Sequence, residues 1–321
     1  MNRADIETGL RSRPESPFRG FDSNMLPVNA RMRRGKVRDS FELGNRLLIV
    51  TTDRISAFDR VLTTIPFKGE VLNRLSVYWF NATRDVFPNH LIEQAGARSM
   101  LVTRGEVIPI EVVVRGYLTG SAWRDYQTVQ SVSGIVLSPG MRVNERFSQP
   151  LLTPSTKEEQ GRHDEPISRE EIVRRGIVAS ERWEEIERAA RALFLRGGKM
   201  AAERGLILVD TKYEFAISNG RLMVVDEMHT PDSSRFWYAD SYDELFKEGK
   251  DQRKVDKEYL RQWLMERGFS GEGEPPAIPD EVRAEVAWRY IQAFELITGE
   301  EFVPESIDGE AEQRKIASLL E

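Results

Sequence analysis

The segment LVDTKYEF, residues 208–215, places two acids and a lysine inside an otherwise strand-like apolar run. Because side chains alternate between the two faces of a strand, Asp210, Lys212 and Glu214 share one face. A simple interpretation is a solvated face with a cross-strand ion pair, which contributes a few tenths of a kcal/mol. The alternative is a metal–nucleotide site, since Mg²⁺ takes one or two carboxylates with phosphate oxygens and a lysine supplies a point charge for the phosphates.

A second apolar run follows the dipeptide NG at 219–220 and ends in Asp226 and Glu227. The length of the connecting loop decides which of these acids joins Glu214. A two-residue turn at 219–220 places Glu227 on the face of Glu214, whereas a three-residue loop at 218–220 places Asp226 there. Spacing alone leaves both registers open.

Two polar clusters offer donors that suit a phosphate or a carboxylate. The segment PDSSRFW contains Ser233, Ser234 and Arg235, and the run IPIEVVVRGYLTGSAW contains Arg115 and Ser121 where its β-branched part stops at glycine. An arginine that leaves a buried strand beside a glycine turn fits an anion clamp. Each cluster taken alone is more often a turn or a surface loop, so they carry weight only in combination.

Other segments give weaker signals. GKVRDSF places Gly35 and Lys36 before a strand, but it is neither a Walker A motif nor a GxGxxG motif. RGGKMA, residues 196–201, lacks the full Walker A spacing, and its glycines are interpreted as interrupting or ending a helix. Two further polar stretches have no assigned chemistry by themselves: TTDRISAFD, with Asp53, Arg54, Ser56 and Asp59, and the loop LLTPSTKEEQGRHDEPIS.

Composition limits the class of protein. The 321 residues are 40% hydrophobic and 31% charged, with a formal net charge of -6, which argues against a nucleic-acid binder. The absence of cysteine excludes disulfides, thiolate metal sites and cysteine nucleophiles, and three histidines argue against a histidine-rich metal site. No apolar run approaches the roughly 20 residues that span a bilayer. The N-terminus lacks the apolar core of a secretory signal, so a cytoplasmic protein is expected.

The order of elements predicts an α+β fold, with strands early and helices late. A hairpin is expected from strands at 36–41 and 46–51 with a turn at 43–45. Helices are expected in EVLNRLSVYWFNATRDVF from its apolar spacing, after the capping box of Ser168 and Glu171, and after Ser180 as an N-cap. The last third turns helical, interrupted by GFSGEGEPPAIP.

Taken together, seven segments occur in an order that resembles the SAICAR synthetase family of purine biosynthesis. They are GKVRD, TTDRISAFD, IPIEVVVRGYLTGSAW, PSTKEE, HDEPIS, LVDTKYEF and VVDEMHTPDSSRFW, and they run from about Gly35 to Trp237. IPIEVVVRGYLTGS and LVDTKYEF are the most specific. Ala216 stands where the family generally has glycine, which affects the expected backbone geometry more than the chemistry.

The resemblance implies an ATP-dependent ligase that joins L-aspartate to the carboxylate of carboxyaminoimidazole ribotide (CAIR). It implies Mg²⁺ with ATP, and an acyl phosphate formed by transfer of the γ-phosphoryl group and then attacked by the aspartate amine. Such chemistry depends on positioning and charge neutralisation more than on a nucleophilic side chain. The partners implied are these small molecules, with no nucleic acid and no membrane, and a monomer is favoured over a dimer.

The resemblance also implies an ATP-grasp or kinase-like nucleotide site between two domains. Residues 1–21 are expected as a loose tail and 22–105 as a strand-rich nucleotide-covering domain. Residues 106–250 are expected as a larger α+β domain with the ATP–Mg²⁺ and substrate site, and 251–321 as helices packed on that domain.

Residue roles are implied by the same resemblance. Lys212 and Arg235 are the catalytic candidates, and Glu214 with Asp226 would hold Mg²⁺, which favours the three-residue loop. The nucleotide would contact Gly35, Lys36, Arg38, Glu111 and Lys212. The substrate would contact Asp59, Arg115, Ser121, Asp164, Ser234 and Arg235, with His163 and Glu165 beside Asp164.

Two other classes of protein compete with the ligase. A kinase that phosphorylates a hydroxyl is expected to carry an HRDxxxxN loop followed by DFG, and the sequence contains neither. A regulatory protein that only binds nucleotide is expected to lose Lys212, Glu214 or Arg235, and all three are present. Both observations favour the ligase.

Overall fold

The computed structural model describes residues 1–12, 17–27, 30–58, 60–157, 165–255, 258–305 and 309–320. The chain divides into two compact units, each built from separate stretches of sequence. Unit 1 comprises Met1–Tyr78, His90–Arg104 and Asp256–Glu321, and unit 2 comprises Trp79–Asn89 and Gly105–Val255.

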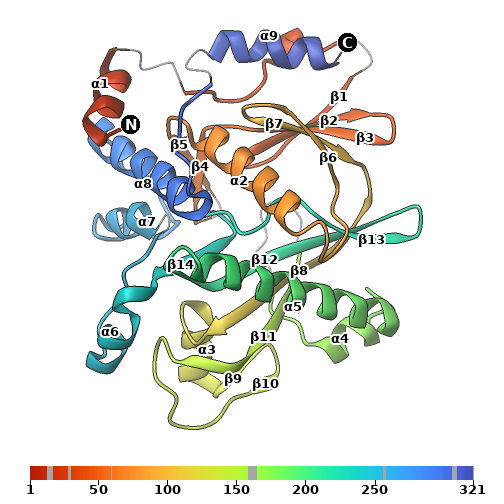
Figure 1. The fold of residues 1–321 in the computed structure, drawn as a ribbon, viewed down its shortest axis with the longest axis vertical. Coiled ribbons are helices and arrows are strands. Elements are labelled where there is room, and N and C mark those ends of the chain that lie inside the picture. The colour runs from red at the N-terminus through yellow and green to blue at the C-terminus, as the bar shows by residue number, and fades with distance from the viewer. Residues whose placement is uncertain are drawn as a thin grey trace. The chain divides into compact units, whose positions relative to one another are not determined.

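Unit 1 contains a five-stranded antiparallel sheet of order β1-β2-β3-β7-β6 (Figure 1). Its strands are β1 (Arg31–Arg34), β2 (Arg38–Leu43), β3 (Arg46–Thr51), β6 (Leu91–Gly96) and β7 (Ser99–Thr103). Leu43 pairs with Arg46, so the predicted early hairpin is confirmed and turns on two residues. A separate hairpin joins β4 (Arg54–Ala57) to β5 (Arg60–Thr64).

The helices of unit 1 come from both ends of the chain. They are α1 (Arg3–Ser12), the 3-10 helix η1 (Ser23–Met25), α7 (Glu258–Met265), α8 (Asp280–Thr298) and α9 (Gly309–Leu320), and α2 (Lys68–Ala82) starts in this unit. The predicted helix in the segment 70–87 is therefore confirmed.

The N-terminal segment differs from the expected loose tail. Residues 3–12 form α1, which packs on α8 with Ile6 and Leu10 buried. The C-terminal helices also differ from the expected packing on the central domain, since they belong to unit 1. There, Ile316 and Leu320 of α9 complete a core with Phe18 and other apolar residues, namely Phe21, Phe41, Leu48 and Val50.

Unit 2 is built on an antiparallel sheet of order β11-β8-β12-β13, with β14 also paired to β12. Its strands are β8 (Glu106–Tyr117), β11 (Arg146–Thr156), β12 (Leu206–Ser218), β13 (Arg221–Val225) and β14 (Ser234–Tyr238). The inner face is apolar: Tyr213 lies opposite Val112 and Thr211 opposite Val114, and all four residues are at most 1% exposed.

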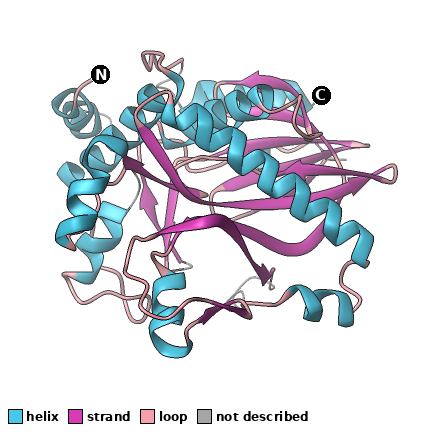
Figure 2. Ribbon diagram, turned by 60° about the horizontal axis from the view of Figure 1, so that its bottom comes forward, coloured by secondary structure: helices cyan, strands magenta, loops and turns pink. Residues whose placement is uncertain are grey.

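The long helix α5 (Ser180–Ala202) covers this inner face (Figure 2). Gly197 lies inside the helix, so the prediction that residues 196–201 interrupt or end a helix is wrong. A Cβ at Gly197 would lie 2.2 Å from the His229 ring, so glycine permits the close approach of helix and loop. Ser180 is the first helical residue and extended Ala179 is the N-cap, which corrects the expected cap.

The remaining elements of unit 2 are short. They are α3 (Ser121–Val129), β9 (Ser131–Val132), β10 (Ile135–Val136), α4 (Arg169–Arg174), the 3-10 helix η2 (Ala239–Ser241) and α6 (Tyr242–Glu248). At α4 the Ser168 side chain accepts a hydrogen bond from the Glu171 N–H at 3.2 Å, so the predicted N-cap is confirmed.

Ala216 takes its place in β12 without disrupting the strand. It is 1% exposed and packs with Met223 and Val225. Room for its methyl group comes from Gly105, where a Cβ would lie 3.0 Å from the Ala216 Cβ. The ladder between β12 and β8 shifts register between Glu214 and Ala216, so the irregularity stays local.

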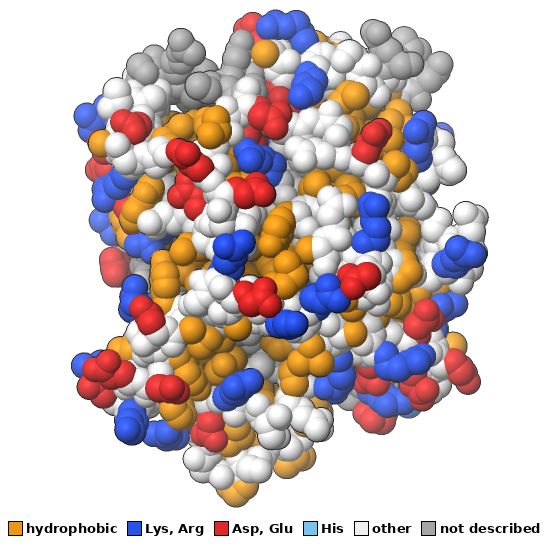
Figure 3. Space-filling model, in the orientation of Figure 1, with side chains coloured by type: hydrophobic (Ala, Val, Ile, Leu, Met, Phe, Trp, Pro, Cys, Tyr) orange, Lys and Arg blue, Asp and Glu red, His pale blue; other side chains and the backbone are white. Residues whose placement is uncertain are grey.

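The surface mixes charges of both signs. On the face drawn in Figure 3, Lys and Arg side chains are interspersed with Asp and Glu. Across the described parts of the chain, no helix combines the length and apolarity needed to cross a membrane.

Candidate active site

The outer face of the unit 2 sheet gathers the charged residues of β12 and β8. Asp210 lies opposite Arg115, and Glu214 lies opposite Glu111. Side chains of directly opposed residues in an antiparallel pair point to the same face. Arg115, Glu111, Asp210, Lys212 and Glu214 therefore share the face that alternation along β12 predicts to be polar.

Lys212 stands at the centre of an ion-pair network on this face. Its Nζ donates to Glu111 Oε1 and lies 3.4 Å from Glu214 Oε1. Lys157, which directly follows β11, donates from its Nζ to the other oxygen of Glu214. The network thus joins residues from β8 and β12 with a residue next to β11, far apart in the sequence.

The network perturbs the pKa of both central groups. Burial by itself would lower the pKa of Lys212, but Glu214, Glu111 and Asp226 more than offset it and raise the pKa above its ordinary value. Burial would raise the pKa of Glu214, yet Lys212 and Lys157 hold it below the ordinary value. Lys212 is therefore cationic and Glu214 anionic at neutral pH.

Asp226 reaches Lys212 by a route that strand alternation does not provide. Ser218 pairs with Arg221, so the loop at 219–220 has two residues and the predicted three-residue loop is wrong. Both loop residues have positive φ, 50° and 76°, as a type I′ turn requires. β13 then ends at Val225, and Asp226 has a left-handed φ of 69°, which breaks the alternation and brings its carboxylate near Lys212.

Glu227, the alternative acid, is engaged in the following loop. It is 7% exposed, and its carboxylate accepts a hydrogen bond from the Thr230 hydroxyl. Thr230 in turn contacts Ser233, whose N–H donates to the Thr230 carbonyl at 3.1 Å. Glu227 therefore helps to shape the loop that leads into β14.

A second charged group occupies the same sheet face one step along β12. Arg235 of β14 donates to Asp210 at 2.7 Å, and the Arg115 guanidinium lies 3.6 Å from the same carboxylate oxygen. Arg115 also donates to Ser121 at 3.2 Å and to Thr153 at 2.8 Å. Burial lowers the pKa of Arg115, and nearby Arg235 adds to that effect while Asp210 opposes it. Two guanidinium groups that share one carboxylate leave net positive charge for an anion.

Ser234 is not grouped with these arginines. It pairs with Thr211 on the inner face, and its hydroxyl donates to the Thr211 hydroxyl at 2.7 Å. The hydroxyl is 3.4 Å from that of Ser233. Ser234 thus attaches the start of β14 to β12, next to the arginine that β14 carries.

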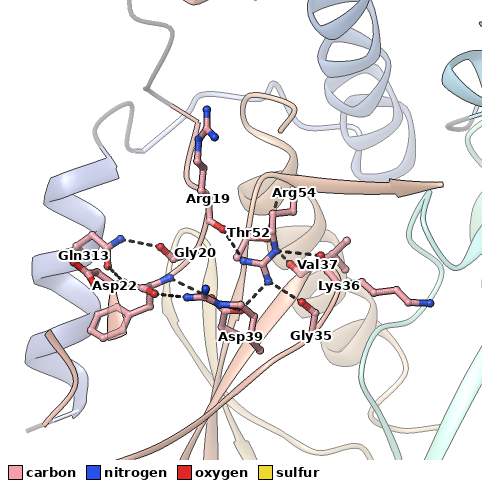
Figure 4. Close-up of polar contacts among 12 residues, drawn as sticks. Arg19, Gly20, Asp22, Gly35, Lys36, Val37, Asp39, Thr52, Arg54 and Gln313 are labelled. Carbon is pink, nitrogen blue, oxygen red and sulfur yellow. Dashed lines mark hydrogen bonds and ion pairs between the residues drawn. The ribbon is translucent and has the colours of Figure 1, made fainter. Parts of the chain in front are cut away.

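The nucleotide candidates Gly35, Lys36 and Arg38 lie in unit 1, around the turn between β1 and β2. The Gly35 N–H donates to the Arg38 carbonyl at 2.7 Å and closes the turn. The Lys36 side chain extends away from Arg54 and Asp39, which lie beneath the turn (Figure 4). Gly35 and Lys36 thus lie in a short hairpin turn that polar contacts support on one side.

Three predicted substrate residues lie outside the described part of the chain: Asp59, His163 and Asp164. Glu165 is described, and it is exposed with its N–H directed to the Thr156 hydroxyl at 3.2 Å.

Sequence reasoning missed Lys157 and the role of Asp210 as a shared partner of two arginines. In the sequence, Lys157 is part of the polar loop LLTPSTKEEQGRHDEPIS and of the segment PSTKEE that contributes to the resemblance. Neither signal relates it to Glu214, because no periodicity connects the two positions. Asp210 belonged to the polar face, but its partners come from two other strands.

The donor set suits Mg²⁺ held together with a nucleotide. Within the described residues, no group of three or more His, Asp or Glu side chains is arranged to hold a metal ion alone. Mg²⁺ usually takes one or two protein carboxylates, with phosphate and water oxygens completing its shell. Glu214 and Asp226 fit that pattern, because both carboxylates are close enough to Lys212 for their charges to raise its pKa.

Comparison with known proteins identifies the family. The model of the SAICAR synthetase family matches residues 31–276. The phosphoribosylaminoimidazole-succinocarboxamide synthase of Bacteroides thetaiotaomicron is 46% identical over 293 residues, covering 90% of this chain and 93% of that protein. The synthase of the same name from Legionella pneumophila strain Paris is 46% identical over 293 residues, covering 89% and 93%.

Solved structures agree on the fold. SAICAR-synthase from Saccharomyces cerevisiae complexed with SAICAR superposes with a TM-score of 0.76 at 34% identity, covering 88% of this chain and 98% of that one. A type-2 SAICAR synthetase in complex with ADP gives 0.67 at 24% identity, which supports the fold alone, over 85% and 100%. The predicted α+β class and the resemblance are both confirmed. This chain belongs to the SAICAR synthetase family, the ATP-dependent ligases that join L-aspartate to CAIR in purine biosynthesis.

Proposed function

We propose that this chain forms the amide bond through an acyl phosphate of CAIR, with the outer face of the unit 2 sheet as its reaction surface. One observation carries the proposal: a lysine–carboxylate network and a pair of arginines lie side by side on that face. Lys212 and Glu214 form the first, and Arg115 with Arg235 form the second. The first suits a metal-bound triphosphate, and the second suits the phosphate or carboxylate of a ribotide.

On the nucleotide side, Lys212 holds an oxygen of the transferring phosphoryl group. Glu214 and Asp226 would hold Mg²⁺, which when bound neutralises charge on the phosphates. Glu111 keeps the Lys212 ammonium in place through their ion pair. Gly35, Lys36 and Arg38 of the β1–β2 turn remain proposed contacts of the nucleotide.

On the substrate side, Arg115 and Arg235 bind the ribotide, and Asp210 fixes the orientation of both guanidinium groups. Ser121 adds a hydroxyl held by Arg115. Ser234 acts indirectly, because its bond to Thr211 secures the strand that carries Arg235. Asp59 and Asp164 remain proposed contacts of the substrate.

The reaction then needs two displacements. A carboxylate oxygen of CAIR attacks the γ-phosphorus, the bond to the β-phosphate oxygen breaks, and ADP leaves. The aspartate amine attacks the acyl carbon, a C–N bond forms, the C–O bond to phosphate breaks, and the amine loses a proton. Positioned charges supply most of the rate enhancement in chemistry of this kind.

The test is ADP release from purified protein given ATP, Mg²⁺ and CAIR, with and without L-aspartate. We expect release that requires CAIR and aspartate together, with the succinocarboxamide product identified by mass. A folded sample that binds ATP yet releases no ADP with both substrates would refute the proposal.

The acyl phosphate has its own test. CAIR labelled with ¹⁸O in its carboxylate should transfer one labelled oxygen to inorganic phosphate, because the C–O bond breaks in the second step. Unlabelled phosphate accompanied by normal product formation would exclude this intermediate. We also expect a monomer, which light scattering after size-exclusion chromatography would establish.

A further inference from the structure

Arg54 is a nearly buried arginine beneath the β1–β2 turn of unit 1. Its guanidinium pairs with the fully buried Asp39 at 2.7 Å, and its side chain is 11% exposed. Figure 4 shows the guanidinium among the backbone carbonyls of Arg19, Gly35 and Lys36. A charged group this deeply buried is costly unless it is paired and its N–H donors are hydrogen-bonded.

Two of the four hydrogen bonds that the Arg54 guanidinium donates go to the turn. Nε donates to the Lys36 carbonyl at 3.1 Å, and Nη2 donates to the Gly35 carbonyl at 2.9 Å. Nη1 donates to the Arg19 carbonyl at 2.6 Å. A planar fork with five N–H donors can serve these acceptors and Asp39 together, which the single ammonium of lysine cannot do at the same positions.

Thr52 holds the next carbonyl of the turn. Its hydroxyl donates to the Val37 carbonyl at 2.8 Å, and its N–H donates to the same oxygen at 2.9 Å. At Gly35, an added Cβ would lie 2.8 Å from the Arg38 carbonyl oxygen, so the turn has no room for a side chain there. Three successive carbonyls, at 35–37, therefore point toward Arg54 and Thr52.

This orientation decides where the amides point. In a trans peptide unit the carbonyl of one residue and the N–H of the next lie on opposite sides of the bond. With the Gly35 and Lys36 carbonyls directed at Arg54, the N–H groups of Lys36 and Val37 are directed away from it. Successive backbone N–H groups that point outward from a tight turn form an anion-binding concavity.

The cluster is also connected to the C-terminal helix. Gln313 of α9 donates to the Gly20 carbonyl at 2.8 Å and accepts from the Asp22 N–H at 3.0 Å. The Phe21 N–H between them donates to Asp39 at 3.1 Å. The segment 19–22 is thus held on one side by α9 and on the other by the Arg54–Asp39 pair.

We propose that Arg54, oriented by Asp39, is a positioning residue that fixes the turn at 35–37 so that its amides face the phosphates of ATP. The inference rests on the proposed function, which assigns Gly35 and Lys36 to the nucleotide. Arg54 contacts the turn directly, through the Gly35 and Lys36 carbonyls. Loss of the Arg54 guanidinium should therefore weaken the binding of ATP but not the binding of CAIR or aspartate.

The first test compares Arg54→Lys with Arg98→Lys. Arg98 is a matched control, because it is a buried arginine of the same unit paired at 2.9 Å with buried Asp53. We expect Arg54→Lys to raise KM for ATP about tenfold, with KM for CAIR and aspartate within about twofold of wild type. Arg98→Lys should leave all three constants near wild type at a similar loss of thermal stability. An equal KM for ATP in the two variants would overturn the inference.

A second pair of variants decides the question if Arg54→Lys does not fold. Thr52→Val replaces the hydroxyl with a methyl group of similar size, and the Val37 carbonyl keeps its bond from the Thr52 N–H. We expect Thr52→Val to raise KM for ATP about threefold and Thr52→Ser to restore it. An unchanged KM for ATP in Thr52→Val would overturn the inference.

Calorimetric titration with ADP and Mg²⁺ separates this inference from the proposed function. Wild-type protein that does not bind ADP would refute the proposed function, and the inference would fall with it. Wild-type protein that binds ADP, with Arg54→Lys binding as tightly as Arg98→Lys, would refute the inference alone. Weaker binding in Arg54→Lys only is the expected result.

Discussion

The ion-pair network around Lys212 contains more negative than positive groups. Glu111, Glu214 and Asp226 supply three carboxylates against the two ammonium groups of Lys212 and Lys157. The excess negative charge favours a divalent cation at this point of the sheet. In the proposed function, a phosphate oxygen of the nucleotide would replace one of these carboxylates as the partner of Lys212.

Lys212→Ala and Asp226→Ala should each abolish turnover while leaving the fold largely intact. We expect a loss of at least about 10²-fold in kcat, as for removal of other groups that stabilise transition-state charge. Lys250→Ala, an exposed lysine of the same unit, is the control. Near-normal activity in both site variants, with far-UV circular dichroism unchanged, would refute the assigned site.

Lys157→Ala should shift the acid limb of the pH–rate profile. Lys157 helps to hold the pKa of Glu214 below its ordinary value, so removing the ammonium raises that pKa. If Glu214 must be ionised to hold Mg²⁺, activity is lost as pH falls through the pKa of Glu214. The acid limb of kcat/KM should therefore move to higher pH in the variant. Profiles that coincide with wild type would show that Lys157 does not act on Glu214.

At the scale of elements, the turn between β12 and β13 and the loop after β13 place the metal candidates. The two-residue turn directs Glu227 toward the outer face, but the strand ends before that position is reached. The left-handed backbone of Asp226 then replaces strand alternation as the determinant of direction. The loop is supported from the inner side by His229, which lies between Gly197 of α5 and Tyr213 of β12.

His229 should make the stability of the protein pH-dependent. Burial lowers the pKa of His229 to about 3. Between pH 6.5 and about 3 the unfolded chain binds a proton that the folded chain does not, so the free energy of unfolding falls as pH decreases. From pH 7 to pH 5 this contribution is about 2 kcal/mol, taking 6.5 for the unfolded histidine.

His229→Gln tests this linkage, because glutamine keeps a hydrogen-bonding group for Tyr213 but does not titrate. Urea denaturation at pH 7 and pH 5 should show a smaller loss of stability in the variant than in wild type. Equal losses in both proteins would mean that His229 is already accessible to protons in the folded state.

At the scale of the whole molecule, neither unit is a continuous stretch of sequence. Unit 1 contains both termini, and its core joins Phe18 and Phe41 to Ile316 from the last helix. The C-terminal helix therefore contributes to the stability of the same unit that carries the turn at 35–37. Unit 1 cannot complete this core without α9.

Ile316→Ala and Leu319→Ala provide a matched test on α9. Ile316 is 0% exposed in the core and Leu319 is 37% exposed on the same helix. We expect Ile316→Ala to lower the free energy of unfolding by about 2–4 kcal/mol. Leu319→Ala should change it by less than about 0.5 kcal/mol. Similar effects of the two changes, measured by urea denaturation, would place α9 outside the core of unit 1.

Local patterns in the sequence were enough for much of the architecture. Alternation along β12 predicted its polar and apolar faces, Ser168 predicted the start of α4, and the apolar spacing of residues 72–79 predicted α2. Family motifs were enough for the reaction class. These signals work because strand alternation, helix periodicity and capping depend on residues only a few positions apart.

Tertiary structure decided what depends on distant segments. Lys157 meets Glu214 across 57 positions and Lys212 meets Glu111 across 101, and only the order and register of strands bring them together. The sequence left Asp226 and Glu227 as alternatives, because the choice depends on a turn length and one left-handed backbone angle. Arg54 lies in the segment TTDRISAFD, but nothing local indicated its role, since its partners are Asp39 and backbone carbonyls from two other segments. The sequence by itself thus determined the fold class and the chemistry, while packing between distant segments determined which side chains meet.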